Sequence, residues 1–288
     1  MNPFKPARVG DTPIIKWSLI TLAVLLSGLL LLVPLASIFQ QAFAGGWQLY
    51  IQHLSQPDAL HAIGLTLIVA ALTVPINLVF GVLLAWSVTR FEFPGRKILI
   101  TLIDIPFAVS PVVAGLLYLL LYGNSGWLGG WLFEHDLQVM FAWPGIVLVT
   151  IFVTCPFVAR ELIPLMQQQG AAEEEAAVIL GASWWQLFRR VTLPNIKWAL
   201  IYGVILTNAR AVGEFGAVAV VSGNIRGETN TLPLHVQLLY EDYQAQAAFA
   251  SASLLALIAL FTLALKAAVE WRQQRSLSAN NDNEPNQL

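Results

Sequence analysis

Few polar side chains lie inside the long apolar runs of this sequence, and chemistry at membrane depth would depend on them. Arg210 and Glu214 are four residues apart in the segment 207–217, TNARAVGEFGA. Two side chains at that spacing share one face of a helix, one turn apart. Because charges are costly in a membrane, the pair either neutralises itself and fixes helix packing, or lines a path on which Arg210 donates hydrogen bonds to an anion.

Asp104 is a third charged residue in such a place. It opens the segment 104–111, DIPFAVSP, in which Pro106 and Pro111 interrupt helical hydrogen bonding. Broken helices are tolerated in a membrane where the freed backbone groups face protein or a cavity, so the segment predicts a kinked helix beside a path. The alternative is a hydrated carboxylate near the membrane interface, because Asp104 lies only seven residues from Lys97.

The residue types that enzymes need are not grouped. The sequence has no glycine-rich phosphate loop of the GxxxxGK(S/T) type and no HExxH. The four histidines, His53, His61, His135 and His235, are not at ligand spacing, and a single cysteine, Cys155, cannot form an intramolecular disulfide. A membrane-embedded enzyme is therefore not favoured. We expect no catalytic residue, metal or cofactor, and active transport would need a separate energy source.

Composition defines the class of protein. Of the 288 residues, 57% are hydrophobic and 11% are charged, with a mean hydropathy of +0.68, whereas soluble domains carry about 25% charged residues. We predict an all-α integral membrane protein with six transmembrane helices, because six apolar runs are long enough to span a bilayer. These runs are 17–39, 61–88, 98–122, 144–165, 198–221 and 247–269.

The domain organisation follows from these runs. A polar and basic segment, 1–16, precedes the first transmembrane helix, 17–39, which is too long for the core of a signal peptide. The remaining spans form one domain, 60–269, which includes a polar loop at 166–197. The final segment, 271–288, has few apolar groups and is predicted to be disordered.

The basic residues indicate the orientation. Thirteen of the 15 lysines and arginines lie on one side of this topology, at both ends of the chain and in the second and fourth loops. Basic residues are enriched in cytoplasmic loops. Both termini and the loop 166–197 are therefore predicted to be cytoplasmic.

The loop 166–197 carries the local signals of two short helices with a corner between them. Residues 171–180 are mostly good helix formers, with three glutamates at 173–175, where the start of a helix favours carboxylates. Gly181 predicts the end of this first helix, since glycine adopts the left-handed cap conformation at little cost.

The second helix of the loop should begin after Ser183. Ser183 with Gln186 three residues later fits a capping box. Leu193-Pro194 predicts its end, because proline cannot donate to the helical ladder and disfavours helix at the preceding residue.

A set of fixed positions in this loop resembles the EAA loop of ABC importer permeases. The set comprises Glu175, Ala176, Ala177, Gly181, Val191, Leu193 and Pro194, with Val191 a mild departure from the isoleucine of that pattern. The resemblance implies a coupling helix that docks into a groove on an ATP-hydrolysing subunit. By spacing alone, an amphipathic loop lying on the membrane surface is the alternative. The residues implied in docking are Glu175, Ala176, Ala177, Gly181, Trp184, Trp185, Leu193 and Pro194.

Four further segments resemble the permeases of sulfate/thiosulfate importers, which are type I importers with a MetI-like transmembrane domain. These segments are 89–96, 104–115, 208–217 and 220–229. Molybdate permeases share the AlaArgAlaxGlyGluPheGly segment but are usually shorter, so a permease for molybdate or tungstate is the alternative. A non-ABC channel or secondary transporter is a further one. The residues themselves do not distinguish one tetrahedral oxyanion from another.

The resemblance also implies partners and a mechanism. A complex in a bacterial inner membrane would contain this multi-pass subunit, a paralogous permease of the CysT (CysU) type, two CysA-type ATP-binding subunits and a periplasmic sulfate/thiosulfate-binding protein. ATP would close the nucleotide-binding subunits, which would pull the coupling helices and open the path outward, by alternating access. Membrane lipid is a further expected partner, and no nucleic acid is expected.

Overall fold

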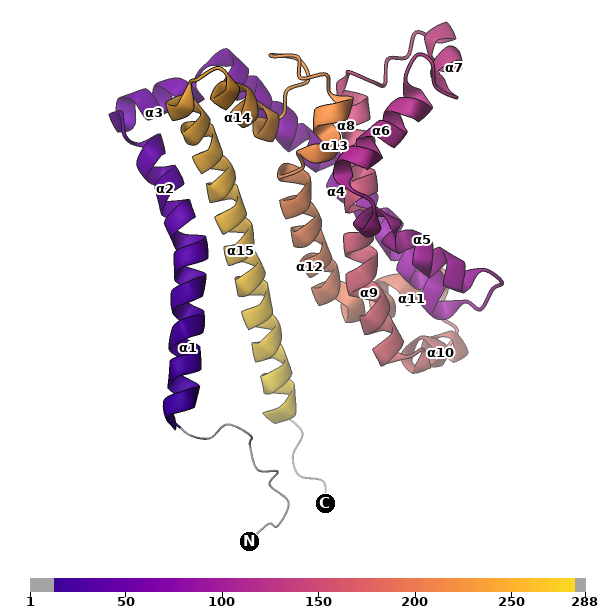
Figure 1. Ribbon diagram of the computed structural model, residues 1–288. Helices are drawn as coiled ribbons and strands as arrows, with labels where there is room; N and C mark the ends of the chain where they lie inside the picture. The colour runs from indigo at the N-terminus through magenta and orange to yellow at the C-terminus, as the bar shows by residue number, and fades with distance from the viewer. Residues whose placement is uncertain (1–12, 283–288) are drawn as a thin grey trace.

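The computed structural model describes the backbone of residues 13–282 and the side chains of residues 15–272 (Figure 1). The described residues form helices and no strand, which confirms the predicted all-α class. Most of the predicted N-terminal segment 1–16 lies outside them, as do residues 283–288. Residues 271–282 are helical and not disordered as predicted, because the arginines and glutamines at 272–275 favour extension of the preceding helix.

The helices are named here in chain order. They are α1 (Pro13–Ser27), a π-helical turn (Gly28–Leu32), α2 (Val33–Ala42), α3 (Gly46–Leu54), α4 (Pro57–Arg90), α5 (Arg96–Ala108), α6 (Pro111–Tyr122), α7 (Gly129–Glu134), α8 (Trp143–Thr154), α9 (Pro156–Gln169), α10 (Ala172–Ile179), α11 (Trp184–Leu187), a second π-helical turn (Phe188–Thr192), α12 (Leu193–Val212), α13 (Gly216–Val221), α14 (Leu232–Glu241) and α15 (Ala245–Asp282).

Four continuous helical segments in the described part of the chain are long and apolar enough to cross a membrane. They are Ile15–Ala42, Pro57–Arg90, Trp143–Gln169 and Ala245–Arg272. They coincide with the first, second, fourth and sixth predicted spans. The segment Ile15–Ala42 joins α1 to α2 through the first π-helical turn, and the segment Trp143–Gln169 joins α8 to α9.

The third predicted span is bent. α5 and α6 meet at 108° across a short break at Val109 and Ser110. Pro111 starts α6, and its ring favours the extended backbone that Ser110 adopts, with ψ 137°. The predicted proline kink is therefore confirmed, although Pro106 stays inside α5.

The fifth predicted span, 198–221, is not one continuous helix. α12 ends at Val212, the next three residues are not helical, and α13 begins at Gly216. α12 carries Lys197 and Arg210 and is not among the four continuous spans. Six crossings with both termini in the cytoplasm remain a prediction, in which two of the six would be broken helices.

α4, α9 and α12 pack against one another and carry the polar loop. Val158 of α9 lies between two glycines. A Cβ atom on Gly81 of α4 would stand 2.6 Å from the Val158 Cβ, and one on Gly203 of α12 would stand 3.1 Å from its Cα. Glycine therefore permits the close approach of three membrane helices. The buried contacts continue toward the loop through Leu162 and Met166.

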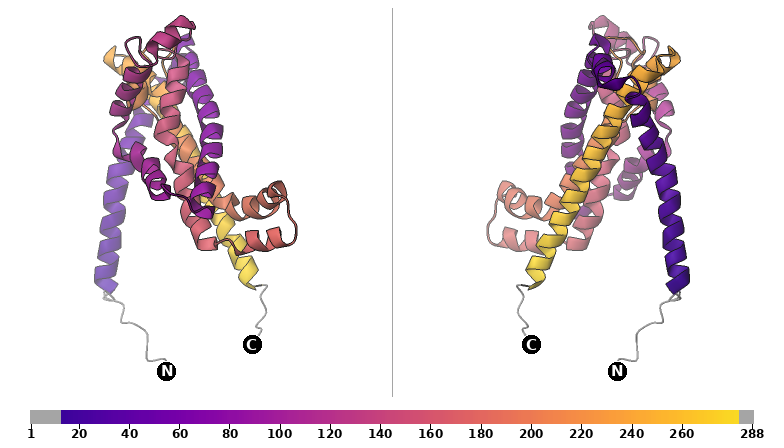
Figure 2. Two further views of the ribbon diagram at one scale, coloured as in Figure 1. Left: turned by 90° about the vertical axis from the view of Figure 1, so that its right-hand side faces the viewer. Right: turned by 90° about the vertical axis from the view of Figure 1, so that its left-hand side faces the viewer.

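α10 and α11 project from this three-helix unit as a short pair (Figure 2). On the other side of the molecule, α2 packs against α15 (Figure 1). The side chains of the first span are exposed along most of its length.

Candidate functional site

The first helix and the corner of the polar loop form as predicted. α10 has the three glutamates in its first turn and ends at Ile179. Gly181 follows with φ +84°, in the left-handed region. Its N–H donates to the Val178 carbonyl at 2.9 Å, and the Ala182 N–H donates to the Ala177 carbonyl at 3.0 Å. Nothing lies within 4 Å of a Cβ built on Gly181, so its backbone angle, and not a lack of space, favours glycine there.

The second helix begins as predicted but does not end as predicted. The Ser183–Gln186 capping box is present: the Gln186 N–H donates to Ser183 Oγ at 3.4 Å, and the Ser183 N–H donates to Gln186 Oε1 at 2.9 Å. α11 then continues through the π-helical turn directly into α12, with Pro194 in the first turn of α12. A proline inside a helix removes one hydrogen bond and crowds the carbonyl four residues before it; for Pro194 that carbonyl belongs to Arg190 in the π turn, which is wider than an α turn and so relieves the crowding. The prediction that Leu193-Pro194 ends the helix is wrong for this reason.

The projecting end of the loop is strongly apolar. We call its large exposed side chains the loop patch: Val178, Ile179, Leu180, Trp184 and Trp185. Ile179 and Leu180 are 84% and 87% exposed. Apolar patches with a polar surround mark interaction surfaces. The sequence identified the two tryptophans, but Ile179 and Leu180 were missed; their position between a helix end and the corner glycine is the signal that could have found them.

The other predicted docking residues differ in their exposure. Glu175, Ala176, Gly181 and Pro194 are exposed, whereas Ala177 and Leu193 are half-buried. The carboxylate that the structure buries is Glu174, the neighbour of the motif glutamate.

Glu174 binds the end of α4. The Arg90 Nε donates to Glu174 Oε2 at 2.6 Å, and its Nη2 donates to Oε1 at 3.3 Å. The Thr192 Oγ1 donates to the same Oε1 at 2.8 Å, and the Arg90 Nη1 donates to the Met166 carbonyl at 3.1 Å. Sequence reasoning used Arg90 only as a sign of orientation, because its partner lies 84 residues away in the chain.

Trp86, one turn before Arg90 on α4, contacts the second helix of the loop. Its ring stacks on Trp184 with centroids 5.8 Å apart and on Phe188 at 5.2 Å. Sequence reasoning also missed Trp86, since an aromatic residue inside a predicted span has no distinguishing local signal.

Arg210 and Glu214 meet as an ion pair, but not on one helix. The Arg210 Nη1 lies 2.5 Å from Glu214 Oε2. Glu214 falls in the break after α12, and its Oε1 accepts the Ala217 N–H of α13 at 3.0 Å. The pair therefore bridges the break between α12 and α13. The Glu214 side chain is 1% exposed and that of Arg210 is 33% exposed, so only Arg210 is accessible from outside.

Asp104 forms a separate pair. The Arg160 Nε lies 3.2 Å from Asp104 Oδ1, and both side chains are about half exposed. The Arg160 guanidinium also lies over the Phe107 ring, 4.6 Å from its centroid. The structure thus joins α5 to α9 through Asp104 and places the two candidate charges, Asp104 and Arg210, in different ion pairs.

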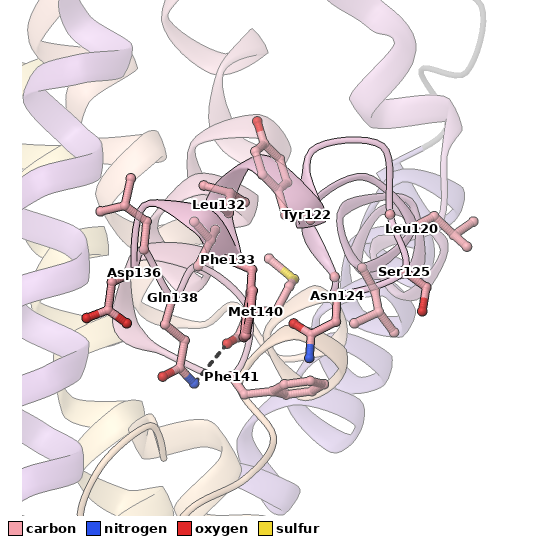
Figure 3. Close-up of a pocket in the computed structure, with 16 residues that line it drawn as sticks. Leu120, Tyr122, Asn124, Ser125, Leu132, Phe133, Asp136, Gln138, Met140 and Phe141 are labelled. Atoms are coloured by element: carbon pink, nitrogen blue, oxygen red, sulfur yellow. Dashed lines mark hydrogen bonds between the residues drawn. The ribbon is translucent and has the colours of Figure 1, made fainter.

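A cavity of about 650 Å³ lies far from the loop patch, among α6, α7 and the segment before α8 (Figure 3). Its polar side chains include Asn124, Ser125, Asp136 and Gln138, and the Gln138 Nε2 donates to the Met140 carbonyl at 3.4 Å. Among the described residues, no group of three or more histidine, cysteine, aspartate or glutamate side chains could hold a metal ion.

A bundle of membrane-spanning helices with a projecting two-helix loop between α9 and α12 is the architecture of an ABC importer permease. One chain of a solved structure, the "bacterial ABC transporter involved in the import of the acidic polysaccharide alginate", has the same fold, with a TM-score of 0.73 over 91% of this chain and 96% of that one, at 17% identity. Residues 77–275 match the family model of the binding-protein-dependent transport system inner membrane component.

The relatives define the branch. The chain is 65% identical to the sulfate transport system permease protein CysW of Escherichia coli (strain K12), over 89% of this chain and 88% of that protein. It is 40% identical to the sulfate transport system permease protein CysT of the same strain, over 82% and 87%. The chain belongs to the binding-protein-dependent transport permeases, in the branch of CysW-type sulfate permeases.

Proposed function

We propose that this chain is one of two membrane-spanning subunits of an ATP-driven importer that carries sulfate and thiosulfate inward across a bacterial inner membrane. The observation that carries this proposal is the loop patch, which presents Leu180 and its neighbours to solvent at the end of a rigidly held loop. Such a patch needs a protein partner. The EAA-like motif around it points to an ATP-hydrolysing subunit, because this chain has no phosphate-binding loop of its own.

The partners are proposed from the relatives. CysW and CysT of one Escherichia coli strain are both named sulfate transport system permeases. The stronger likeness to CysW supports a complex in which this chain pairs with a CysT-type subunit and two CysA-type ATPases. A structure similar in fold is that of an alginate transporter with its ligand-bound periplasmic protein, which supports a sulfate-binding periplasmic protein as the fourth kind of component.

The proposed topology has six crossings with both termini in the cytoplasm. Residues 60–269 form the transport domain, the bent α5–α6 pair and the broken α12–α13 pair each serve as one crossing, and the loop 166–197 faces the cytoplasm. Thirteen of the 15 basic residues then lie inside.

The Arg210–Glu214 and Asp104–Arg160 ion pairs have unequal roles in this proposal. Glu214 holds the break between α12 and α13, because one of its oxygens binds Ala217 and the other binds Arg210. Arg210 keeps part of its guanidinium exposed and carries five N–H donors. It is the side chain that would contact a passing oxyanion, whereas Asp104 would fix α5 against α9.

Uptake of labelled sulfate tests the substrate. Cells that lack this chain alone should regain sulfate uptake when it is restored, and excess molybdate should not compete. The names of the relatives support sulfate over molybdate. Restored accumulation of molybdate without sulfate uptake would overturn the substrate and leave the permease assignment in place.

A further inference from the structure

We propose that Trp86 and Arg90 of α4 form a two-point clamp on the loop 166–197, and that α4 carries the movement of this loop toward the opposite end of the molecule. The inference rests on the proposed function, since it concerns how the coupling loop acts on the membrane helices. The two residues are four apart on one helix and so share one face, one turn apart.

The Arg90 half of the clamp holds three elements at once. Its guanidinium binds the Glu174 carboxylate of α10 through two hydrogen bonds and the Met166 carbonyl of α9 through a third. Glu174 in turn accepts a hydrogen bond from the hydroxyl of Thr192, a buried residue of the second π-helical turn. Two-pronged contacts of this kind fix orientation as well as distance. Because the Arg90 and Glu174 side chains are each only 11% exposed, water competes little for their bonds.

The Trp86 half holds the second helix of the loop. Trp86 stacks on Trp184 with an interplanar angle of 13° and on Phe188 with 18°. Trp184 also belongs to the loop patch, and the residue is 65% exposed. A partner that docks on the patch therefore presses on a ring that already rests on α4.

α4 connects this clamp to the far end of the molecule. It is 34 residues long, which corresponds to about 51 Å at 1.5 Å per residue. Near its other end, the Leu232 N–H at the start of α14 donates to Thr66 Oγ1 at 2.8 Å. Pro75 lies between these two attachments and marks the place where the helix can bend. A displacement of the loop must thus move α4, and α4 is bonded to the segment that leads into α14.

The test uses the complete importer in proteoliposomes, assembled from this chain, its paralogous permease, the ATPase subunits and the periplasmic protein. ATP hydrolysis is measured with and without the sulfate-loaded periplasmic protein, and co-purification of the ATPase reports docking. The variants are Trp86→Leu, Trp86→Phe, Arg90→Gln and the charge exchange Arg90→Glu with Glu174→Arg. Lys97→Gln is the matched control, because it removes an exposed charge from the same end of the membrane domain.

The expected result separates transmission from docking. Trp86→Leu and Arg90→Gln should retain the ATPase subunits but lose about five-fold or more of the stimulation, the lower range of coupling between distant sites. Trp86→Phe and the charge exchange should recover part of it, and Lys97→Gln should behave as wild type. Wild-type stimulation in Trp86→Leu and Arg90→Gln would overturn the clamp.

Two further outcomes are decisive. If Arg90→Gln fails to assemble, the tryptophan variants decide, and equal stimulation in Trp86→Leu and Trp86→Phe overturns the clamp. A wild-type complex that shows no sulfate-dependent stimulation would instead overturn the proposed function.

Discussion

Leu180→Ser should weaken docking of the ATPase subunit without disturbing the permease itself. Leu180 is 87% exposed, so nearly all of its side-chain surface is available for burial in an interface. Full burial of a leucine side chain contributes about 1.5–3 kcal/mol, and each 1.4 kcal/mol changes an equilibrium about tenfold. We therefore expect an affinity about 10- to 100-fold weaker. The folded permease loses no internal packing, because the side chain makes few contacts with its own chain.

The assay is titration of the purified ATPase subunit onto the permease pair held in lipid nanodiscs. Leu180→Met is the control, since methionine retains a similar apolar volume and should bind within a few-fold of wild type. An unchanged affinity in Leu180→Ser, with the permease pair intact, would refute the docking role of the loop patch.

Three further perturbations have defined outcomes. Gly181→Ala places a β-carbon at φ +84°, which costs about 1–2 kcal/mol, so it should reduce sulfate-stimulated ATP hydrolysis, whereas Gly64→Ala, in open space on α4, should not. Arg210→Gln leaves Glu214 a buried carboxylate without its partner, so membrane accumulation should fall; adding Glu214→Gln should restore accumulation but not sulfate uptake. Burial lowers the pKa of His235 below its usual 6.5, so thermal stability should be highest above that pH and fall on acidification toward pH 5.5.

Each of these outcomes has a counterpart that would contradict it. Equal loss of stimulation in both glycine variants would remove the special role of the corner. Wild-type sulfate uptake by the double Arg210 and Glu214 variant would leave the pair a purely structural role. For His235, the same fall in stability on acidification in His235→Gln would assign that fall to other groups.

The sequence predicts the local structure of the loop better than its anchoring. Gly181 and the Ser183–Gln186 box act through neighbouring residues, so their spacing alone indicates a helix end and a helix start. Arg90 and Glu174 meet across 84 residues, and no local pattern reports such a contact. The resemblance to the EAA motif pointed to Glu175, whereas the buried carboxylate is its neighbour.

The sequence also predicts the continuous spans better than the broken ones. Hydropathy and length predict continuous spans such as Pro57–Arg90, because these need only a long apolar run. The fifth run predicts one helix, since 198–221 is mostly apolar and its charged residues are Arg210 and Glu214 alone. The break is stabilised by Glu214, which accepts a hydrogen bond from the Ala217 N–H three residues later; this contact is local, but hydropathy and run length do not report it. The continuation through Pro194 likewise depends on a π-helical turn that composition does not reveal.

The most direct test of the central claim is uptake of labelled sulfate into proteoliposomes that contain the complete importer, with ATP supplied on the side of the ATPase subunits or withheld. Sulfate should accumulate only with ATP and the periplasmic protein, and the accumulation should fall in Leu180→Ser. Equal sulfate flux without ATP would contradict an ATP-driven importer and favour a channel or secondary transporter.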